Sequence, residues 1–133
     1  MPWPRFILVA LLLIVLARPT ASSSSVPGAE VVSMVQLIAT PEKFDGKAVL
    51  VVGFLRLEFE GNCLYLHKED YEHSITKNGV WIVRNAVINA KRDTLNMHYV
   101  VVVGTFSAKN RGHMDLNSGS LGNITAASLW TRP

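Results

Sequence analysis

Hydrophobic and polar residues alternate along the middle of the chain, over residues 47–68. From residue 49 to residue 59 every second position is apolar or glycine, and a period of two residues indicates a β-strand. The positions in between are apolar as far as Phe54 and charged after it. One half of this second face is therefore expected to lie under another element, and the other half to meet water. Gly53 lies at the change, where a strand glycine commonly marks a bulge or a bend.

A tight hairpin is predicted to follow this strand, because the Gly-Asn pair at residues 61–62 suits a two-residue turn. The turn would place Arg56 opposite His67 and Glu58 opposite Tyr65. This register separates apolar from polar pairs, whereas a slip by one residue would mix them. The side chains expected on the surface are Arg56, Glu58, Tyr65 and His67, and those expected in the core are Leu57, Phe59, Leu64 and Leu66.

The remaining elements are one short helix and three further strands. Ser33 and Gln36 have the spacing of a capping box, which predicts that a helix begins there, and Pro41 ends it. Residues 67–79 are rich in charge and predict a loop with one helical turn, while residues 85–97 are an ambiguous connector. The further strands are expected at residues 80–84, 98–108 and 123–129.

Two strands share a local pattern that predicts the fold. The sequence VVGFL at residues 51–55 resembles VVGTF at residues 102–106, and each long strand carries a glycine at its middle. A closed five-stranded barrel needs strands that bend enough to serve both of its sides. We therefore predict a mainly β fold, a five-stranded OB-fold-like barrel with a short N-terminal helix, in which the first and fourth strands are neighbours and curve at Gly53 and Gly104.

The N-terminus has the pattern of a signal peptide. Arg5 precedes an apolar run at residues 6–17, which is too short for a bilayer span of about 20 residues, and small residues follow. An uncleaved anchor helix is the alternative. We expect a signal peptide and Ser-rich cleavage region at residues 1–25, a linker at 26–32, the OB-fold-like domain at 33–129 and a tail at 130–133. The expected location is periplasmic or secreted, with no transmembrane span in the mature chain.

The charge balance changes once this segment is removed. The chain has 13 Lys and Arg against 10 Asp and Glu, and Arg5 and Arg18 leave with the signal, so the mature part carries 11 minus 10, or +1. Nucleic acid is therefore not expected as a partner, because backbone binding depends on many cationic contacts. A single cysteine, Cys63, cannot form a disulfide within the chain. The expected partner is a small molecule, a glycan or an envelope protein.

Three stretches resemble a family of short, largely uncharacterised bacterial proteins. They are EKFDGKAVLVVGFL, GNCLYLHKEDYEH and VVVVGTFSAKNRGHMD, and the resemblance covers residues 30–129. It implies an exported OB-fold-like domain, and it implies no established activity.

The candidate site is the face that OB-folds commonly use, on their second and third strands with the flanking loops. Arg56 and His67 would supply polar recognition, and aromatic rings would stack on a planar group. The ring of Tyr65 could equally be a cross-strand packing partner. The predicted ligand-binding residues are Arg56, Tyr65, His67, Tyr71, His73, Trp81 and His113.

Two alternatives to a binding module stay open. One is a metal-dependent hydrolase using His67, His73 and His113, although their spacing matches no standard zinc motif. The other is a structural or protein-interaction module of the cell envelope. The chain has no G-x-S-x-G elbow and no P-loop. We therefore expect an exported binding module rather than an enzyme, with no catalytic residues, no cofactor and no bound metal.

Export makes a direct prediction about the mature protein. N-terminal sequencing of the protein isolated from its cell should give a first residue between Ser22 and Val26. Soluble cytoplasmic protein that still begins at Met1 or Pro2 would contradict export.

Overall fold

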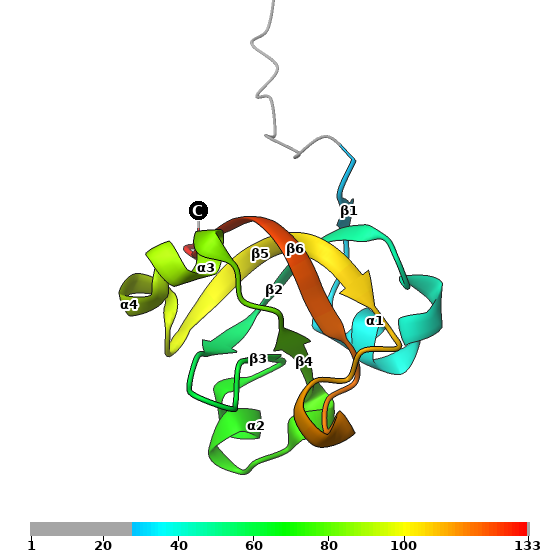
Figure 1. The fold of residues 1–133 in the computed structure, drawn as a ribbon, viewed down its shortest axis with the longest axis horizontal. Helices are drawn as coiled ribbons and strands as arrows, with labels where there is room; N and C mark the ends of the chain where they lie inside the picture. Colours follow the sequence, from blue (N-terminus) through cyan, green and yellow to red (C-terminus); the bar gives the residue numbers. More distant parts are fainter. Residues whose placement is uncertain (1–27, 133) are drawn as a thin grey trace, which may run out of the picture.

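The computed structural model describes residues 28–132, so the predicted signal peptide lies outside the described residues. Five strands close into a barrel, and a two-residue strand is added at its edge (Figure 1). The strands are β1 (Glu30–Val31), β2 (Ala48–Arg56), β3 (Cys63–Tyr65), β4 (Gly79–Ile82), β5 (His98–Ser107) and β6 (Ser120–Leu129). The helices are α1 (Met34–Ala39), α2 (Lys68–Glu72), α3 (Ala86–Ala90) and α4 (Arg92–Leu95), with 3-10 turns at Pro41–Lys43, Thr76–Asn78 and His113–Asp115.

The strand order confirms the predicted OB-fold-like barrel. β2 pairs antiparallel with β3, β3 with β4, and β5 with β6, while β4 pairs parallel with β6. Antiparallel pairing of β2 with β5 closes the barrel, so the first and fourth barrel strands are neighbours, as predicted. None of the helices within residues 28–132 has the length and apolar character that a bilayer crossing requires.

Side-chain alternation on β2 places its odd-numbered residues in the barrel interior. Val49, Val51 and Leu55 are fully buried there, whereas Leu50 and Val52 on the outer face are half-buried. The other strands contribute to the same core through Leu64, Val80, Ile82, Val100, Val102, Phe106, Leu121, Ile124 and Ala127. The predicted period-two pattern of the strand is therefore confirmed.

The two strand glycines have different local roles. The ladder between β5 and β6 shifts register between Val103 and Thr105, so Gly104 lies at an irregularity of the kind expected. Pairing of β2 with β5 continues without a shift through Gly53. Gly53 instead allows a close approach of strands, because a Cβ there would lie 2.6 Å from the carbonyl oxygen of Tyr65. Immediately after it, β2 begins to pair with β3.

The predicted hairpin register was wrong by four residues. Arg56 lies opposite Cys63 and Phe54 opposite Tyr65, so residues 57–62 form a longer loop instead of a two-residue turn. A shift by four keeps the paired residues of β2 and β3 on their predicted faces, because faces alternate with a period of two. The expected pairings of Arg56 with His67 and of Tyr65 with Glu58 do not occur.

Leu57, the first residue after β2, is held by a segment that is distant in the sequence. Its backbone N–H donates to Oδ1 of Asn96 at 2.8 Å, and its side chain is fully buried in the core. The bond continues the hydrogen bonding on the side of β2 that faces β5, where the N–H of Met97 already donates to the Leu55 carbonyl at 2.8 Å. Phe59, predicted to be in the core, is 93% exposed in the loop after β2.

The short helices follow from local signals. Ser33 and Gln36 form the predicted capping box at the start of α1. In the connector whose structure the sequence left ambiguous, Oδ1 of Asn85 accepts from the N–H of Ile88 at 3.3 Å and begins α3. Ile88 and Leu95 bury their side chains in the barrel core from α3 and α4.

Substitution of Gly53 tests the close approach. Gly53→Ala should lower the free energy of unfolding by about 1–3 kcal/mol, because the new methyl group overlaps the backbone of β3. Gly122→Ala is the matched control, since the nearest atom to its new Cβ is 3.7 Å away. Urea denaturation of both variants beside wild type measures the difference. Equal losses for the two variants would contradict the assigned role of Gly53.

Candidate functional site

The predicted ligand face exists on the outside of the barrel. Leu64 and Val80 point into the core, so the neighbouring residues of β3 and β4 point outward. Cys63 pairs with Trp81 across the two strands, and Tyr65 follows on the same face of β3. The outward placement of Tyr65 and Trp81 therefore agrees with the sequence.

Aromatic side chains from the same chain cover this face. The Tyr71 ring from α2 lies 5.9 Å from the Tyr65 ring and 6.3 Å from the Phe54 ring, between centroids. The Tyr99 ring from β5 meets Phe54 edge-on at 5.5 Å. Tyr65 is only 6% exposed as a result, so the expectation of an exposed Tyr65 was wrong. Packing, which the sequence left as the alternative, describes this ring.

A buried carboxylate holds α2 over the strands. Asp70 accepts from the backbone N–H of His67 at 2.9 Å and from Nδ2 of Asn78 at 2.9 Å, one bond to each oxygen. The N–H of Ile75 donates to the Asp70 carbonyl at 2.8 Å. Asp70 is thus the organising residue of the charged loop, and the ring of His67 remains largely exposed beside it.

The loop between β5 and β6 covers the other half of the face. Nδ2 of Asn117 donates to Sγ of Cys63 at 3.0 Å and to the carbonyl of Thr76 at 3.3 Å. Gly112 adopts a φ of +72° against the Trp81 ring, where a Cβ would come within 2.6 Å of ring carbons. These contacts close the face around Cys63 and Trp81 with residues of the same chain.

The buried thiol of Cys63 has a raised pKa. Burial raises the pKa of Cys63 to about 12, and hydrogen bonds with the side chains of Tyr65 and Asn117 only partly offset this effect. Burial also raises the pKa of Tyr65 well above its usual value. Because the thiolate is the nucleophilic form, Cys63 is protonated and unreactive near neutral pH.

The structure brings together some of the predicted site residues and separates others. The Arg56 guanidinium lies 5.4 Å from the centre of the Tyr71 ring and forms an ion pair with Glu58 at 3.1 Å. Phe54, Cys63, Tyr65 and Tyr71 form a small cluster outside the barrel. Among the predicted site residues, Tyr65 and Tyr71 belong to this cluster, Arg56 lies over Tyr71, and Trp81 is paired with Cys63.

The histidines do not join the cluster. His67, His73 and His113 are all exposed. Within residues 28–132 no group of three or more His, Cys, Asp or Glu side chains is arranged to hold a metal ion. The geometry thus gives no support to the metal-dependent hydrolase considered from the sequence.

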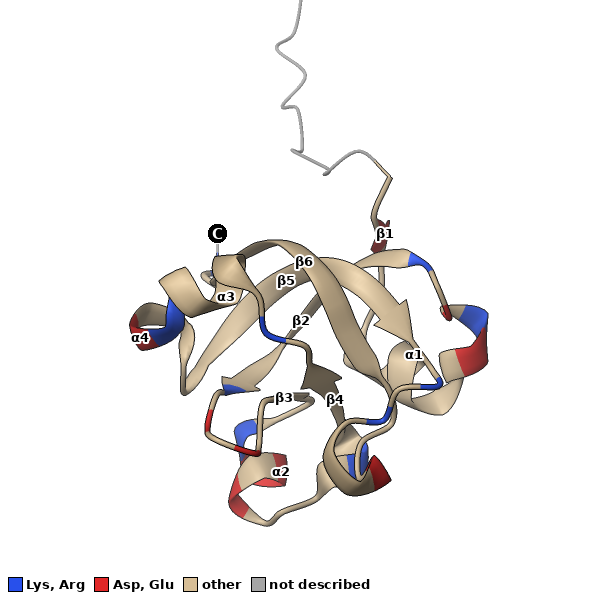
Figure 2. Ribbon diagram, viewed as in Figure 1, with Lys and Arg blue, Asp and Glu red and all other residues tan. Residues whose placement is uncertain are grey.

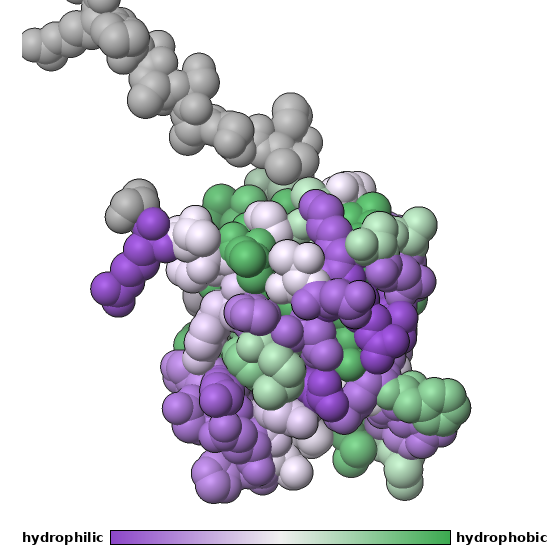
Figure 3. Space-filling model, turned by 90° about the vertical axis from the view of Figure 1, so that its left-hand side faces the viewer, coloured by the Kyte–Doolittle hydropathy of each residue, from purple (hydrophilic) through white to green (hydrophobic). Residues whose placement is uncertain are grey.

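Charged residues lie mainly on the helices and loops, while most of the barrel ribbon carries none (Figure 2). On the face shown in Figure 3, hydrophobic side chains lie along the upper part of the view, hydrophilic ones dominate the middle and the lower left, and a hydrophobic group protrudes at the lower right. An apolar binding surface is therefore expected on the wall of the barrel.

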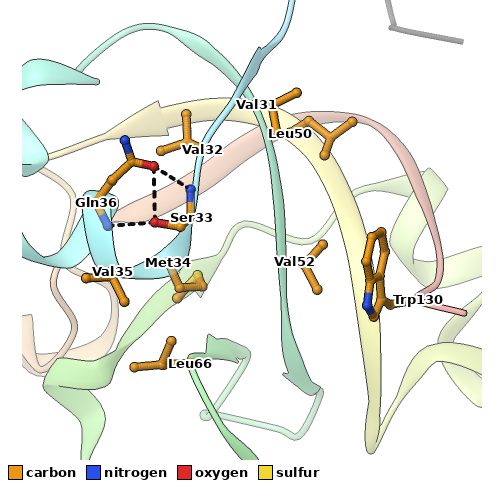
Figure 4. A pocket seen from close by; sticks show the side chains of 10 residues that line it. All are labelled: Val31, Val32, Ser33, Met34, Val35, Gln36, Leu50, Val52, Leu66 and Trp130. Carbon is orange, nitrogen blue, oxygen red and sulfur yellow. Dashed lines mark hydrogen bonds between the residues drawn. The ribbon is translucent and has the colours of Figure 1, made fainter. Parts of the chain in front are cut away.

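An apolar groove of about 520 Å³ runs over the outer face of β2, between α1 and Trp130 (Figure 4). None of its lining residues is charged. Val31 is 75% exposed, Val35 57% and Trp130 50%. The full lining is Val31, Val32, Ser33, Met34, Val35, Gln36, Leu50, Val52, Leu66 and Trp130.

Local hydrogen bonds shape both walls of the groove. Gln36 accepts from the N–H of Ser33 at 2.9 Å, and its own N–H donates to Oγ of Ser33 at 3.2 Å, so the polar groups of the α1 wall satisfy one another. On the other side the N–H of Trp130 donates to the carbonyl of Tyr99 at 2.9 Å. This bond fixes Trp130, which the sequence had assigned to the tail, against the barrel.

Sequence reasoning missed this groove, although it contained one signal. The outward positions of β2 are apolar up to Phe54, which predicted a covering element over that half of the strand. α1 covers it only in part, and Leu50 and Val52 remain half-buried. β1, which brings Val31 to the groove, falls within the expected linker.

Comparison with known proteins adds no relative: no protein family, curated protein or solved structure matches this chain. The resemblance to short bacterial proteins stays a prediction, and the groove has to be interpreted from its own chemistry.

The covered aromatic face predicts a stability effect. Tyr65→Ala should lower the free energy of unfolding by about 3 kcal/mol or more, as large-to-small core substitutions do. Tyr65→Phe, which keeps the ring, should cost no more than about 1.5 kcal/mol, the value of one hydrogen bond. Urea denaturation compares the two. A Tyr65→Ala protein as stable as wild type would show that the ring is not held between β3 and α2.

Proposed function

We propose that this chain is an exported binding module that holds an apolar ligand in the groove over β2. The observation that carries the proposal is the uncharged groove of about 520 Å³ with a half-exposed tryptophan on its rim. Ligand sites in proteins commonly have volumes of about 300–1,000 Å³ and mainly apolar walls. Indole rings are over-represented where binding energy is concentrated.

The rest of the surface supports this location. The face of β3 and β4, where the sequence predicted a ligand, is filled by α2 and by the loop between β5 and β6. A ligand there would have to displace Tyr71 or Asn117 from buried contacts. The groove needs no such displacement, because Val31, Val35 and Trp130 are already exposed to solvent. Export is the second part of the proposal and is supported by the N-terminal sequence pattern.

A fluorescence titration tests the groove. The probe is N-phenyl-1-naphthylamine, an uncharged apolar fluorophore, added to protein in which Trp130 is the only tryptophan (Trp3→Phe, Trp81→Phe). Probe fluorescence should rise as Trp130 fluorescence falls. Val35→Glu should weaken binding at least tenfold, because it introduces a carboxylate into an uncharged wall.

The matched control is Ala39→Glu, which places the same charge on an exposed position of the same helix, outside the groove. It should bind the probe as wild type does. The helix itself should tolerate Val35→Glu, since an acidic residue in the first turn is favourable. Equal affinity of the Val35→Glu and wild-type proteins for the probe would overturn the proposed site.

A further inference from the structure

The outer edge of β2 has a gap in its hydrogen bonding at Val52. The Leu50 carbonyl accepts from the N–H of Val32 at 3.0 Å, so the backbone of Leu50 points away from β5. β2 pairs with β5 without a register shift from Ala48 to Leu55. Backbone direction alternates along such a ladder, so the N–H and C=O of Val52 point to the same side as those of Leu50.

No strand of the described chain meets Val52 on that side. β1 ends its pairing at Leu50, because the chain turns at Ser33 to begin α1. β3 begins its pairing only at Phe54. One backbone donor and one backbone acceptor are therefore left between the two neighbouring strands, and Val52 is one of the residues that line the groove.

This backbone gap distinguishes between apolar ligands. An alkyl chain would fill the groove and exclude water from the N–H and C=O of Val52 without replacing the lost hydrogen bonds, which is unfavourable for each of the two groups. An extended peptide offers both a donor and an acceptor at that position, together with apolar side chains for the groove. Addition of a peptide segment to an exposed strand edge is a general mode of recognition.

The charges around the groove restrict the peptide further. None of the lining residues is charged, and at the start of β1 Glu30 forms an ion pair with Lys47 at 3.7 Å. A charged side chain inside the groove would find no partner among the lining residues. We infer that the groove binds an extended peptide segment with uncharged, apolar side chains, whose backbone pairs with the N–H and C=O of Val52. This inference rests on the proposed function and names its ligand class.

The test compares three probes on the full protein. The first is the capped peptide acetyl-KVLVAVK-amide, whose lysines lie at its ends for solubility. The second is the same peptide with every central backbone amide N-methylated, which keeps the side chains and removes the N–H donors. The third is dodecyl maltoside, an uncharged probe with an alkyl chain. Each is titrated by competition with N-phenyl-1-naphthylamine.

The inference expects the first peptide to compete and the N-methylated peptide to bind at least tenfold more weakly. Addition of the first peptide should slow amide hydrogen exchange at Val52 at least tenfold relative to the free protein. Addition of the naphthylamine should leave that exchange rate unchanged. Val51, whose backbone already pairs with β5, is the control amide. The Val35→Glu protein should no longer bind the first peptide, and the Ala39→Glu protein should bind it as wild type does.

The outcomes separate the two proposals. Equal binding of the methylated and unmethylated peptides, or a Val52 amide already protected in the free protein, would overturn the peptide inference alone. Competition by dodecyl maltoside without competition by the peptide would also overturn it and would leave the groove as an apolar site. Failure of the naphthylamine itself to bind would overturn the proposed function and the inference that rests on it.

Discussion

The ladder between β2 and β5 is the interaction on which the rest of this structure depends. Eight residue pairs, from Ala48 with Thr105 to Leu55 with His98, join the first and fourth barrel strands without a register shift. Closing the barrel in this way leaves no free edge on β5. It also uses the backbone hydrogen bonds on one side of β2 along most of the strand. The other side of β2 has to be shared between β1 and β3, and Gly53 allows β3 to approach where its share begins.

This division of β2 also determines what its outer face can do. Where β3 pairs, α2 and the loop between β5 and β6 fold back over the strands, and the aromatic rings and Cys63 form a second small core outside the barrel. Where β1 pairs for only two residues, the strand remains half-buried and the groove opens. The same strand therefore carries a covered outer surface at one end and an open apolar groove at the other.

The aromatic cluster shows why residue type alone is weak evidence for a binding site. Tyrosine, tryptophan, arginine and histidine on an outer strand face are the residues expected of a ligand surface, and they are also good at sealing a short helix onto a barrel. Asp70 decides between these roles, because its two buried hydrogen bonds hold α2 in place. The stacking surface of Tyr65 is consequently occupied by Tyr71.

Local patterns in the sequence determined the strand faces, the capping box at Ser33 and the two glycines at the middle of the long strands, and from these the barrel followed. Each depends on residues close together in the chain, where the period of two or the reach of one helical turn leaves little choice. The hairpin offset could not be obtained in this way, because alternation fixes which face a residue takes but not how far two strands slide in even steps. The chain beyond β2 is held by contacts such as the bond from the Leu57 N–H to Asn96, 39 positions later, which no local pattern contains. Burial of Tyr65 and exposure of Val31 and Trp130 likewise depend on segments far apart in the sequence, since what covers a side chain is decided only when those segments pack.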